Sequence, residues 1–352
     1  MTNPAKRYRV VQWATGNVGT RALRRVIEHP DLDLAGVWVH SPGKAGRDAG
    51  ELAGLPHTGV KATNKIEDIL ALKPDCALYM PHVCNFDEIC TLLEAGINIV
   101  TTRMELQNPK ALDEAIYQRV QAACQRGQSS IHATGSSPGF ITEAVPLVLA
   151  SLQRRFDYLT IDEFADCSSR NSPEMLFEMM GFGKKPGAAN QAALDHARLC
   201  FGPSLQLFAT SIGLPVENFE VSGAVGLARQ DVHIAAGVVP AGTIAAMKTT
   251  IAGIRGGKPI VSFTSNWFIS TDVNTSDGQE WEFLSPSGWR VRLQGDCPLD
   301  VSISFPCPIE EYAEMTPGLT AHRPVNAIPY VCEAPPGVQT TADLPQIIAR
   351  LG

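Results

Sequence analysis

The 352-residue sequence lacks the patterns that mark membrane, secreted and nucleic-acid-binding proteins. No apolar run approaches the roughly 20 residues needed to span a bilayer, and the N-terminal residues have no apolar core of a secretory signal. The net charge of −7 leaves no broad basic surface for a nucleic acid. We therefore expect a cytoplasmic protein that binds small molecules through local groups, with no nucleic-acid or membrane partner.

Patterns for disulfides, metal sites and common nucleophiles are missing as well. The nine cysteines include no C-x-x-C, and the eight histidines include no H-x-x-x-H. With no export signal, we expect free thiols in a reducing compartment and no metal site. There is no G-x-S-x-G elbow and no P-loop, and Cys84 beside His82 is a weak candidate for cysteine chemistry.

What the sequence does contain, over residues 8–150, is a regular alternation of buried strands and helical patterns. Strands are predicted at residues 8–15, 34–40, 76–81, 97–102 and 129–134. Strands separated by helices are typical of α/β proteins with a parallel, Rossmann-type sheet and right-handed crossovers. We assign residues 1–154 to such a dinucleotide-binding domain.

After about Arg154 the pattern changes. Longer alternating strands predict a second, α+β domain built on a mostly antiparallel sheet, over residues 155–319. One amphipathic helix is predicted within it, ended by Gly256-Gly257. Its apolar residues at helical spacing are Ile244, Met247, Ile251 and Ile254.

The stretch QWATGNVGT, residues 12–20, has the form of a dinucleotide-binding turn in which alanine replaces the first glycine. It lies between the first strand and the first helix, the context in which G-x-G-x-x-G carries meaning. Gly16 lets the backbone approach a pyrophosphate at the helix start, and Gly19 lets the helix pack against the strand. The alternative is a tight turn with no ligand. The predicted cofactor residues here are Ala14, Thr15, Gly16, Asn17, Val18 and Gly19.

The loop after the second strand carries basic residues in place of the acid that usually binds the ribose of NAD. It reads HSPGK from His40 to Lys44, with Arg47 close behind. Ser41, Lys44 and Arg47 can hold a 2′-phosphate, which favours NADP as the cofactor and leaves NAD possible. The alternative is that both cations are solvated loop charges. We add His40, Ser41, Lys44 and Arg47 to the predicted cofactor site.

The loop TTRMELQNP follows the predicted strand at residues 97–102, at the sheet edge where ligands of open α/β folds gather. Its one carboxylate, Glu105, is a candidate general acid/base, because a nicotinamide site closed by the second domain would let it exchange protons with an amine or hydroxyl. The alternative is a glutamate that only favours a helix dipole. Thr102 is assigned to the cofactor, and Arg103 to the substrate pocket, where it could clamp a carboxylate.

Loops after the predicted strands at residues 76–81 and 129–134 supply further contacts. Pro81 and His82 are assigned to the cofactor, although such a histidine is more often a hydrogen-bonded wall residue. Gly139, in GSSPGF, brings the backbone close to the nicotinamide, and Phe140 forms an apolar wall.

The stretch SPEMLFEMMGF in the second domain supplies the last predicted substrate-pocket residues. We assign Met175 and Met179 to an apolar pocket, with ordinary core packing as the alternative.

Together these stretches resemble one family. QWATGNVG, TTRMEL followed by NP, ATGSSPGFITEAVPL and AHRPVNAIPYVCEAPPG are similar to the dihydrodipicolinate-reductase-like dehydrogenases. They resemble most closely the branch of 2,4-diaminopentanoate dehydrogenase and the native NAD(P)H-dependent amine dehydrogenases. The double histidine and lysine-bearing loop of dihydrodipicolinate reductase itself are missing, which disfavours a role in lysine biosynthesis.

The resemblance implies oxidative deamination of an amine and the reverse reductive amination of a ketone or aldehyde with ammonia. It implies that Glu105 handles the ammonia and imine protons, and that Asn326, in V-N-A-I-P, belongs to the cofactor site. It also implies a homodimer whose second-domain sheets pair, and a C-terminal segment, residues 320–352, that returns to the dinucleotide-binding domain.

Two other functions remain open from the sequence. The same fold could serve a carbonyl reductase or a dihydrodipicolinate-reductase-like reductase that needs no ammonia. A protein of another class would sense NADP without catalysis. Ammonia dependence of NADPH oxidation separates the first from an amine dehydrogenase, and cofactor binding without turnover would identify the second.

Overall fold

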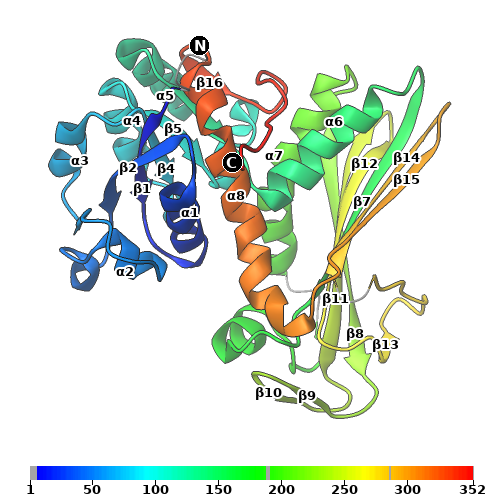
Figure 1. Cartoon of the computed structure of the whole chain (residues 1–352). Helices are drawn as coiled ribbons and strands as arrows, with labels where there is room; N and C mark the ends of the chain where they lie inside the picture. The colour runs from blue at the N-terminus through cyan, green and yellow to red at the C-terminus, as the bar shows by residue number, and fades with distance from the viewer. Residues whose placement is uncertain (1–5, 188–190, 285–286, 352) are drawn as a thin grey trace. The chain divides into compact units, whose positions relative to one another are not determined.

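The computed structural model describes residues 6–187, 191–284 and 287–351, which form two compact units (Figure 1). Unit 1 holds the described residues up to Phe140 and from Thr316 onward, and unit 2 holds those from Ile141 to Met315. The boundaries differ from the expected ones, since residues 141–154 fall in unit 2 and the C-terminal segment of unit 1 begins at Thr316.

Unit 1 contains a seven-stranded sheet whose pairings are all parallel, in the order β16-β6-β5-β4-β1-β2-β3. Its strands are β1 (Tyr8–Trp13), β2 (Leu32–Trp38), β3 (Ala62–Thr63), β4 (Cys76–Tyr79), β5 (Asn98–Thr101), β6 (Ser130–Ala133) and β16 (Gly337–Gln339). Its helices are α1 (Asn17–Glu28), α2 (Ala49–Ala53), α3 (Ile66–Leu72), α4 (Phe86–Glu94) and α5 (Glu114–Gly127). Helix α8 (Tyr312–Cys332) begins in unit 2 and continues into unit 1.

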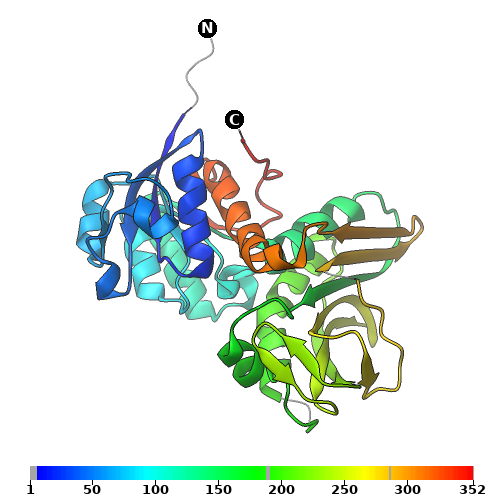
Figure 2. The same cartoon turned by 60° about the horizontal axis from the view of Figure 1, so that its bottom comes forward.

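Alternation along β1 gives the sheet of unit 1 two buried faces. Val11 and Trp13 pack in one cluster with residues of α4 and α5. Tyr8 and Val10 pack in another with α1 and the C-terminal half of α8, which lie side by side in two views (Figures 1 and 2). At the carboxyl end of β1, Trp13 stacks on Trp38 of β2, with ring centroids 4.4 Å apart.

Unit 2 contains a seven-stranded sheet in the order β13-β8-β11-β12-β7-β14-β15, in which only the β12–β7 pairing is parallel. Its strands are β7 (Phe156–Asp166), β8 (Asn218–Ala228), β11 (Ile244–Arg255), β12 (Lys258–Phe268), β13 (Val273–Thr275), β14 (Ser287–Gly295) and β15 (Leu299–Ser304). A separate hairpin joins β9 (Val232–Ile234) to β10 (Gly237–Val239).

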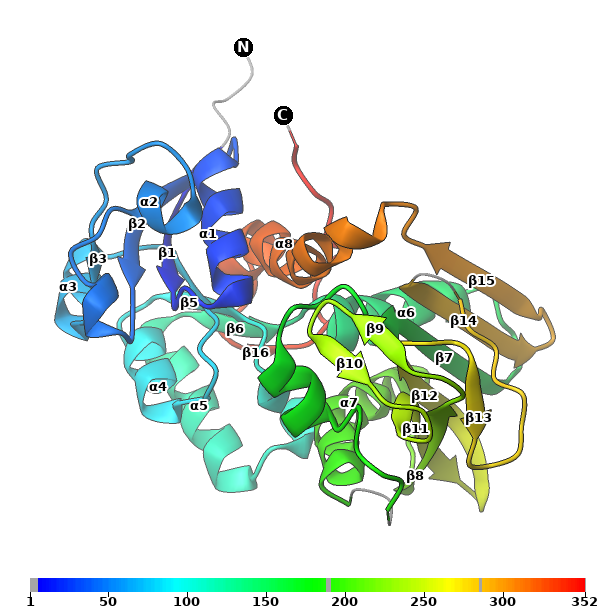
Figure 3. The same cartoon turned by 90° about the horizontal axis from the view of Figure 1, so that it is seen from below.

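One face of the unit 2 sheet is covered by α7 (Gln191–Ser211), as Figure 3 shows together with α6 (Val145–Ala150). Phe201 of α7 stacks on Phe263 of β12, with ring centroids 3.9 Å apart. The expected fold class, a Rossmann-type sheet with a second domain on a mostly antiparallel sheet, is therefore confirmed.

The amphipathic helix predicted over residues 244–254 is wrong, because these residues form strand β11. β11 and β12 are an antiparallel hairpin in which Arg255 pairs with Lys258. Gly256 and Gly257 both have positive φ, at 56° and 72°, as a two-residue type I′ hairpin turn requires. The glycine pair that suggested a helix end is therefore a hairpin turn, and the apolar residues lie on both faces of a strand that has no exposed residue.

Three further findings bear on the protein's class. Among the described residues, no helix is both long enough and apolar enough to cross a membrane. Within the same residues, no cluster of three or more histidine, cysteine or acidic side chains is arranged to hold a metal ion. All nine cysteines are free thiols.

The buried histidine of β6 predicts a pH-dependent stability. Burial lowers the pKa of His132 to about 4, and its Nδ1 lies 3.0 Å from the Gln339 carbonyl oxygen of β16. The unfolded chain binds a proton at this residue below about pH 6.5, whereas the folded chain does not until about pH 4. Stability is therefore lost as the pH falls through this window, by about 2 kcal/mol at pH 5 from this residue alone.

Urea denaturation of wild type and His132→Gln from pH 7 to pH 5 measures this effect. His132→Gln should have a lower free energy of unfolding than wild type at pH 7, because the buried ring is lost. Its free energy of unfolding should fall less than that of wild type between pH 7 and pH 5, because no histidine titrates at this position. Parallel pH profiles for the two proteins would show that other groups carry the acid sensitivity.

Candidate active site

The strand order places several of the predicted site loops along one edge of the unit 1 sheet. β1 lies between β2 and β4, so β2 and β3 extend the sheet on one side of β1 and β4, β5 and β6 extend it on the other. Open α/β sheets form ligand sites at this switch in strand order. The loops after β1, β4, β5 and β6 follow neighbouring strands and share that edge. Backbone hydrogen bonds join neighbouring strand ends along this edge. The Met80 N–H donates to the Trp13 carbonyl oxygen at 3.0 Å, and the Thr134 N–H donates to the Thr101 carbonyl oxygen at 2.9 Å.

The glycine turn after β1 brings the start of α1 against the end of the strand. A Cβ on Gly19 would lie 2.2 Å from the Ala14 carbonyl oxygen, so only glycine fits there. Ala14 has a φ of 73°, a left-handed conformation that glycine usually takes, so it keeps the geometry of the motif's first position. Gln12, buried on β1, donates from Nε2 to the Ala14 carbonyl at 2.8 Å and fixes the turn.

The start of α1 leaves room for a ligand. A Cβ on Gly16 would have no atom within 4 Å, and Gly16 and Asn17 are exposed. Gly16 is the N-cap of α1, and no side chain caps the first helical N–H groups at that position. Open space beside uncapped helical amides, above a tightly packed Gly19, fits a dinucleotide pyrophosphate.

The two predicted phosphate-binding cations occupy different environments. Lys44 reaches back to the glycine turn, where its Nζ donates to the Thr15 carbonyl at 2.8 Å and lies 3.2 Å from the Thr15 hydroxyl. Arg47 is exposed and forms an ion pair with Glu51 of α2 at 2.7 Å. The structure therefore brings Lys44, but not the Arg47 guanidinium, onto the turn. The other two residues predicted in this loop, His40 and Ser41, are exposed.

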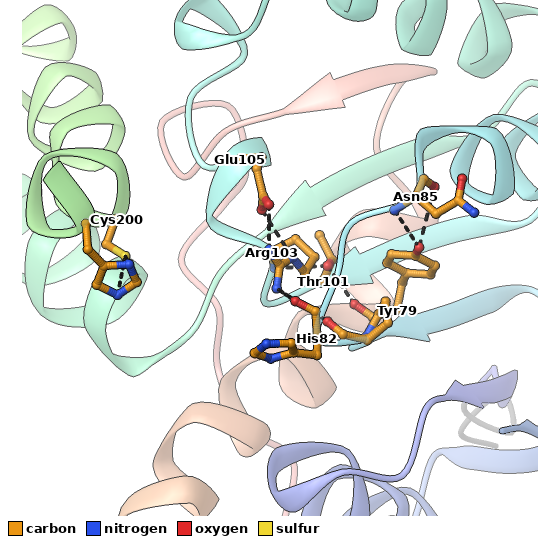
Figure 4. A network of polar contacts seen from close by, with 9 residues as sticks. Tyr79, His82, Asn85, Thr101, Arg103, Glu105 and Cys200 are labelled. Carbon is orange, nitrogen blue, oxygen red and sulfur yellow. Dashed lines mark hydrogen bonds and ion pairs between the residues drawn. The ribbon is translucent and has the colours of Figure 1, made fainter. Parts of the chain in front are cut away.

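The loop after β5 holds a two-point ion pair between Arg103 and Glu105 (Figure 4). The Arg103 guanidinium donates to the two Glu105 carboxylate oxygens at 3.1 and 2.5 Å, and to the His82 carbonyl oxygen at 2.5 Å. The side chain of Arg103 is 14% exposed and that of Glu105 is 34% exposed. The fork geometry fixes the direction of the Glu105 carboxylate, while a third of the side-chain surface stays open to a ligand.

Neighbouring contacts hold this loop in place. The Thr101 hydroxyl donates to the Tyr79 carbonyl oxygen at 2.6 Å and accepts the Arg103 backbone N–H at 3.0 Å. Thr102, which follows directly, is half-buried at the end of β5. Through the Arg103 contact with His82, the loops after β4 and β5 form one hydrogen-bonded surface.

Cys84 lies close to this pair and does not fit a nucleophile. Burial, and then the charge of Glu105, raise the pKa of its thiol to about 12. The thiol therefore stays protonated at neutral pH, and cysteine-based catalysis finds no support here.

The turn after β6 is joined to α8 by side chains that sequence reasoning did not single out. Arg323 donates from Nε to the Thr134 hydroxyl at 3.1 Å, and its guanidinium lies 5.5 Å from the centroid of the Phe140 ring. The Ser136 and Thr320 hydroxyls lie 2.7 Å apart. The motifs AHRPVNAIPY and ATGSSPGF are thus in contact with each other in the folded chain. In the sequence, the only sign of this contact was that both motifs are present.

Gly139 and Phe140 end that turn. Gly139 has a φ of 120°, and a Cβ there would lie 3.0 Å from the Thr134 hydroxyl oxygen, so glycine is required. This close approach keeps the turn against the end of β6, on the edge that carries Glu105.

Other predicted residues lie elsewhere. Asn326 lines a cavity with Tyr8 and His29, at the amino end of β1, and no described contact joins it to the glycine turn. In unit 2, Met175 packs against the core, whereas Met179 is 70% exposed.

Comparisons with known proteins agree with the resemblance seen in the motifs. The chain matches no family model. It is 29% identical over 358 residues to an amine dehydrogenase of Streptomyces virginiae, covering 97% of this chain and 98% of that protein. It is 24% identical over 236 residues to a 4-hydroxy-tetrahydrodipicolinate reductase of Synechococcus elongatus, covering 62% of this chain and 83% of the reductase.

Among solved structures, an amine dehydrogenase from Mycobacterium smegmatis has the same fold. The TM-score is 0.76 with 18% sequence identity, over 98% of both chains. The predicted resemblance to the amine dehydrogenase branch is therefore confirmed.

The glycine turn gives a matched pair of substitutions. Gly19→Ala should lower the free energy of unfolding by about 2 kcal/mol, because the new Cβ meets a backbone oxygen. Gly16→Ala adds the same methyl group to open space and should cost less than about 1 kcal/mol, the ordinary penalty of alanine at an N-cap. Urea denaturation measures both. Equal losses would show that the helix start relaxes freely.

Proposed function

We propose that this chain is an NAD(P)H-dependent amine dehydrogenase. It oxidises a primary amine with NAD(P)⁺ and water to a ketone or aldehyde, ammonia, NAD(P)H and a proton, and it runs the reverse reductive amination. The observation that carries the proposal is the Arg103–Glu105 pair on the edge that bears the glycine turn. Similarity over nearly the whole length of an amine dehydrogenase supports it.

The cofactor site in this proposal is built from the glycine turn and the loops beside it. Gly16 gives the pyrophosphate its space, and Gly19 sets the helix that donates to it. A bound nicotinamide would supply the hydride acceptor or donor. We assign NADP as the preferred form because Lys44 places an ammonium on the turn.

Glu105 acts as the general acid/base. In its ionised form it accepts a proton from the substrate ammonium, which frees the amine lone pair needed for imine formation. After it releases that proton to solvent, the carboxylate takes a proton from the attacking water and passes it to the departing ammonia. In the reverse direction it returns these protons. Arg103 is a positioning residue, because its donors are engaged with Glu105 and the His82 carbonyl oxygen and not with a substrate carboxylate.

The substrate is assigned by what the described loops offer. The Phe140 ring packs against the Arg323 guanidinium and supplies an apolar surface on the turn after β6. With Arg103 held within the chain, we assign an apolar or weakly polar amine in preference to an amino acid. We also assign a homodimer, as the resemblance implies, which sedimentation can check.

Substitution of the carboxylate tests the catalytic role. Glu105→Gln keeps the size of the side chain and removes its charge, and should lower kcat for amine oxidation by about 10²–10⁴-fold with little change in cofactor affinity. Steady-state kinetics on a panel of amines, and of ketones with and without ammonium, make the measurement.

A matched control is Glu67→Gln, an exposed glutamate in the first turn of α3, which should leave kcat unchanged. Unchanged turnover in Glu105→Gln would remove the catalytic assignment. Ketone reduction that proceeds without ammonium would identify a carbonyl reductase, and cofactor binding without turnover would identify a sensor.

The two loop cations test the choice of cofactor. Lys44→Ala should weaken NADP binding by about tenfold or more, the loss of a charge-assisted hydrogen bond, and weaken NAD binding much less. Arg47→Ala should change NADP affinity by only about twofold, because its guanidinium pairs with Glu51. Calorimetry with both cofactors decides. Equal losses of NAD and NADP affinity in Lys44→Ala would assign the lysine to the pyrophosphate and leave the NADP preference unsupported.

A further inference from the structure

A second cavity lies in unit 1, away from the edge that carries Glu105. It has a volume of about 320 Å³ and is lined by residues from the starts of β1 and β2, from α8 and from the C-terminal segment. Tyr8 begins β1 and Ala14 follows its end, so the two regions are separated by the length of the strand, roughly 20 Å. The volume falls at the lower end of the range for small-ligand sites.

A buried histidine supplies a hydrogen-bond donor to this cavity. His29 is 4% exposed, and its Nδ1 accepts the Asp31 backbone N–H at 3.1 Å. The ring proton therefore resides on Nε2, and no described residue accepts it. Burial, and then the charge of Arg25, lower the pKa of His29, so the ring is neutral at neutral pH. The Nε2–H group is therefore a neutral donor on the cavity wall, and a ligand oxygen can accept its hydrogen bond.

α8 supplies acceptors to the same cavity. The Asn326 side-chain Oδ1 is buried and has no hydrogen-bond partner among the described residues. Glu333, one turn beyond Pro329, accepts the Tyr8 hydroxyl proton on Oε1 at 2.5 Å. Burial raises the pKa of Tyr8, so its hydroxyl remains a donor to Glu333. The second carboxylate oxygen of Glu333 has no described partner.

The charges around the cavity balance. The two cations are Lys6, whose ammonium lies 4.7 Å from the Tyr8 ring centroid, and Arg350, which pairs with Asp31 at 3.1 Å. The two carboxylates are Asp31 and Glu333. Within the described chain Lys6 has no carboxylate partner, so one ammonium and the Glu333 carboxylate are available together. A simple anion would meet two carboxylates here, and a simple cation would meet Lys6 and Arg350.

We propose that this cavity is a second binding site, for a small zwitterion of amino-acid size that carries both a carboxylate and an ammonium group. The ligand carboxylate accepts from His29 Nε2–H and Lys6, and the ligand ammonium donates to Glu333 and Asn326. The site is separate from the proposed catalytic edge and does not depend on the proposed reaction.

Ligand binding to the full chain tests the proposal. The twenty L-amino acids are screened singly at about 10 mM by thermal shift, in the range where weak sites saturate, and calorimetry follows any that raise the melting temperature. At least one should bind saturably. Its C-terminal amide, which lacks the carboxylate, and its N-acetyl derivative, which lacks the ammonium, should each bind at least about tenfold more weakly.

Substitutions locate the site. Lys6→Gln and Glu333→Gln change exposed side chains, so the fold should persist, and each should weaken binding by about tenfold or more. Lys65→Gln and Glu67→Gln are matched controls on the exposed start of α3 and should change nothing. Glu105→Gln should also leave this binding intact, which separates it from substrate binding at the catalytic edge.

Three outcomes would overturn the proposal. They are the absence of saturable binding by any of the twenty amino acids, binding that is insensitive to both Lys6→Gln and Glu333→Gln, and binding that disappears in Glu105→Gln.

Discussion

The site depends on one close approach, between the Ala14 carbonyl oxygen at the end of β1 and Gly19 in the first turn of α1. Because glycine has no Cβ, the first turn of the helix can pack directly against the end of the strand. The first N–H groups of the helix then lie at the sheet edge. Gln12 holds the carbonyl from inside the strand. The left-handed backbone of Ala14 shows that an alanine can keep this turn, so the departure from G-x-G-x-x-G changes the sequence motif without changing its geometry.

The carboxyl edge beyond this turn is organised by arginines. Arg103 ties the loop after β5 to the loop after β4, and Arg323 ties the turn after β6 to α8. A guanidinium suits this task because its donors lie in one plane and can reach several acceptors at once. Thr134 and Arg323, which are 189 residues apart in the sequence, are therefore in direct contact at this edge of the sheet.

The sequence predicted β1, β2, β4, β5 and β6 of unit 1, because each is a short apolar run followed by a helical pattern. It did not predict the short strands β3 and β16. The prediction was wrong at residues 244–257, where the apolar residues lie on both faces of a strand and do not alternate. Two consecutive glycines also suit a hairpin turn as well as a helix end. The glycine turn and Glu105 were predicted as site residues from local context. Arg323 was not predicted, since its contact with Thr134 joins segments distant in the sequence. The separation of Asn326 from the glycine turn, and the engagement of Arg47 with Glu51, likewise follow from three-dimensional packing that no spacing encodes.

The stacked indoles of Trp13 and Trp38 sit at the ends of β1 and β2, and the Trp38 carbonyl oxygen accepts the Ala14 N–H at 2.8 Å. Two transition dipoles this close, with planes only 10° apart, couple to each other and give the folded domain a near-ultraviolet circular dichroism signature of its own. Reduced nicotinamides absorb where indole emits, so the pair is also an intrinsic energy-transfer donor for whatever occupies the turn beside it. The chain thus carries its own optical reporter at the bend that follows β1.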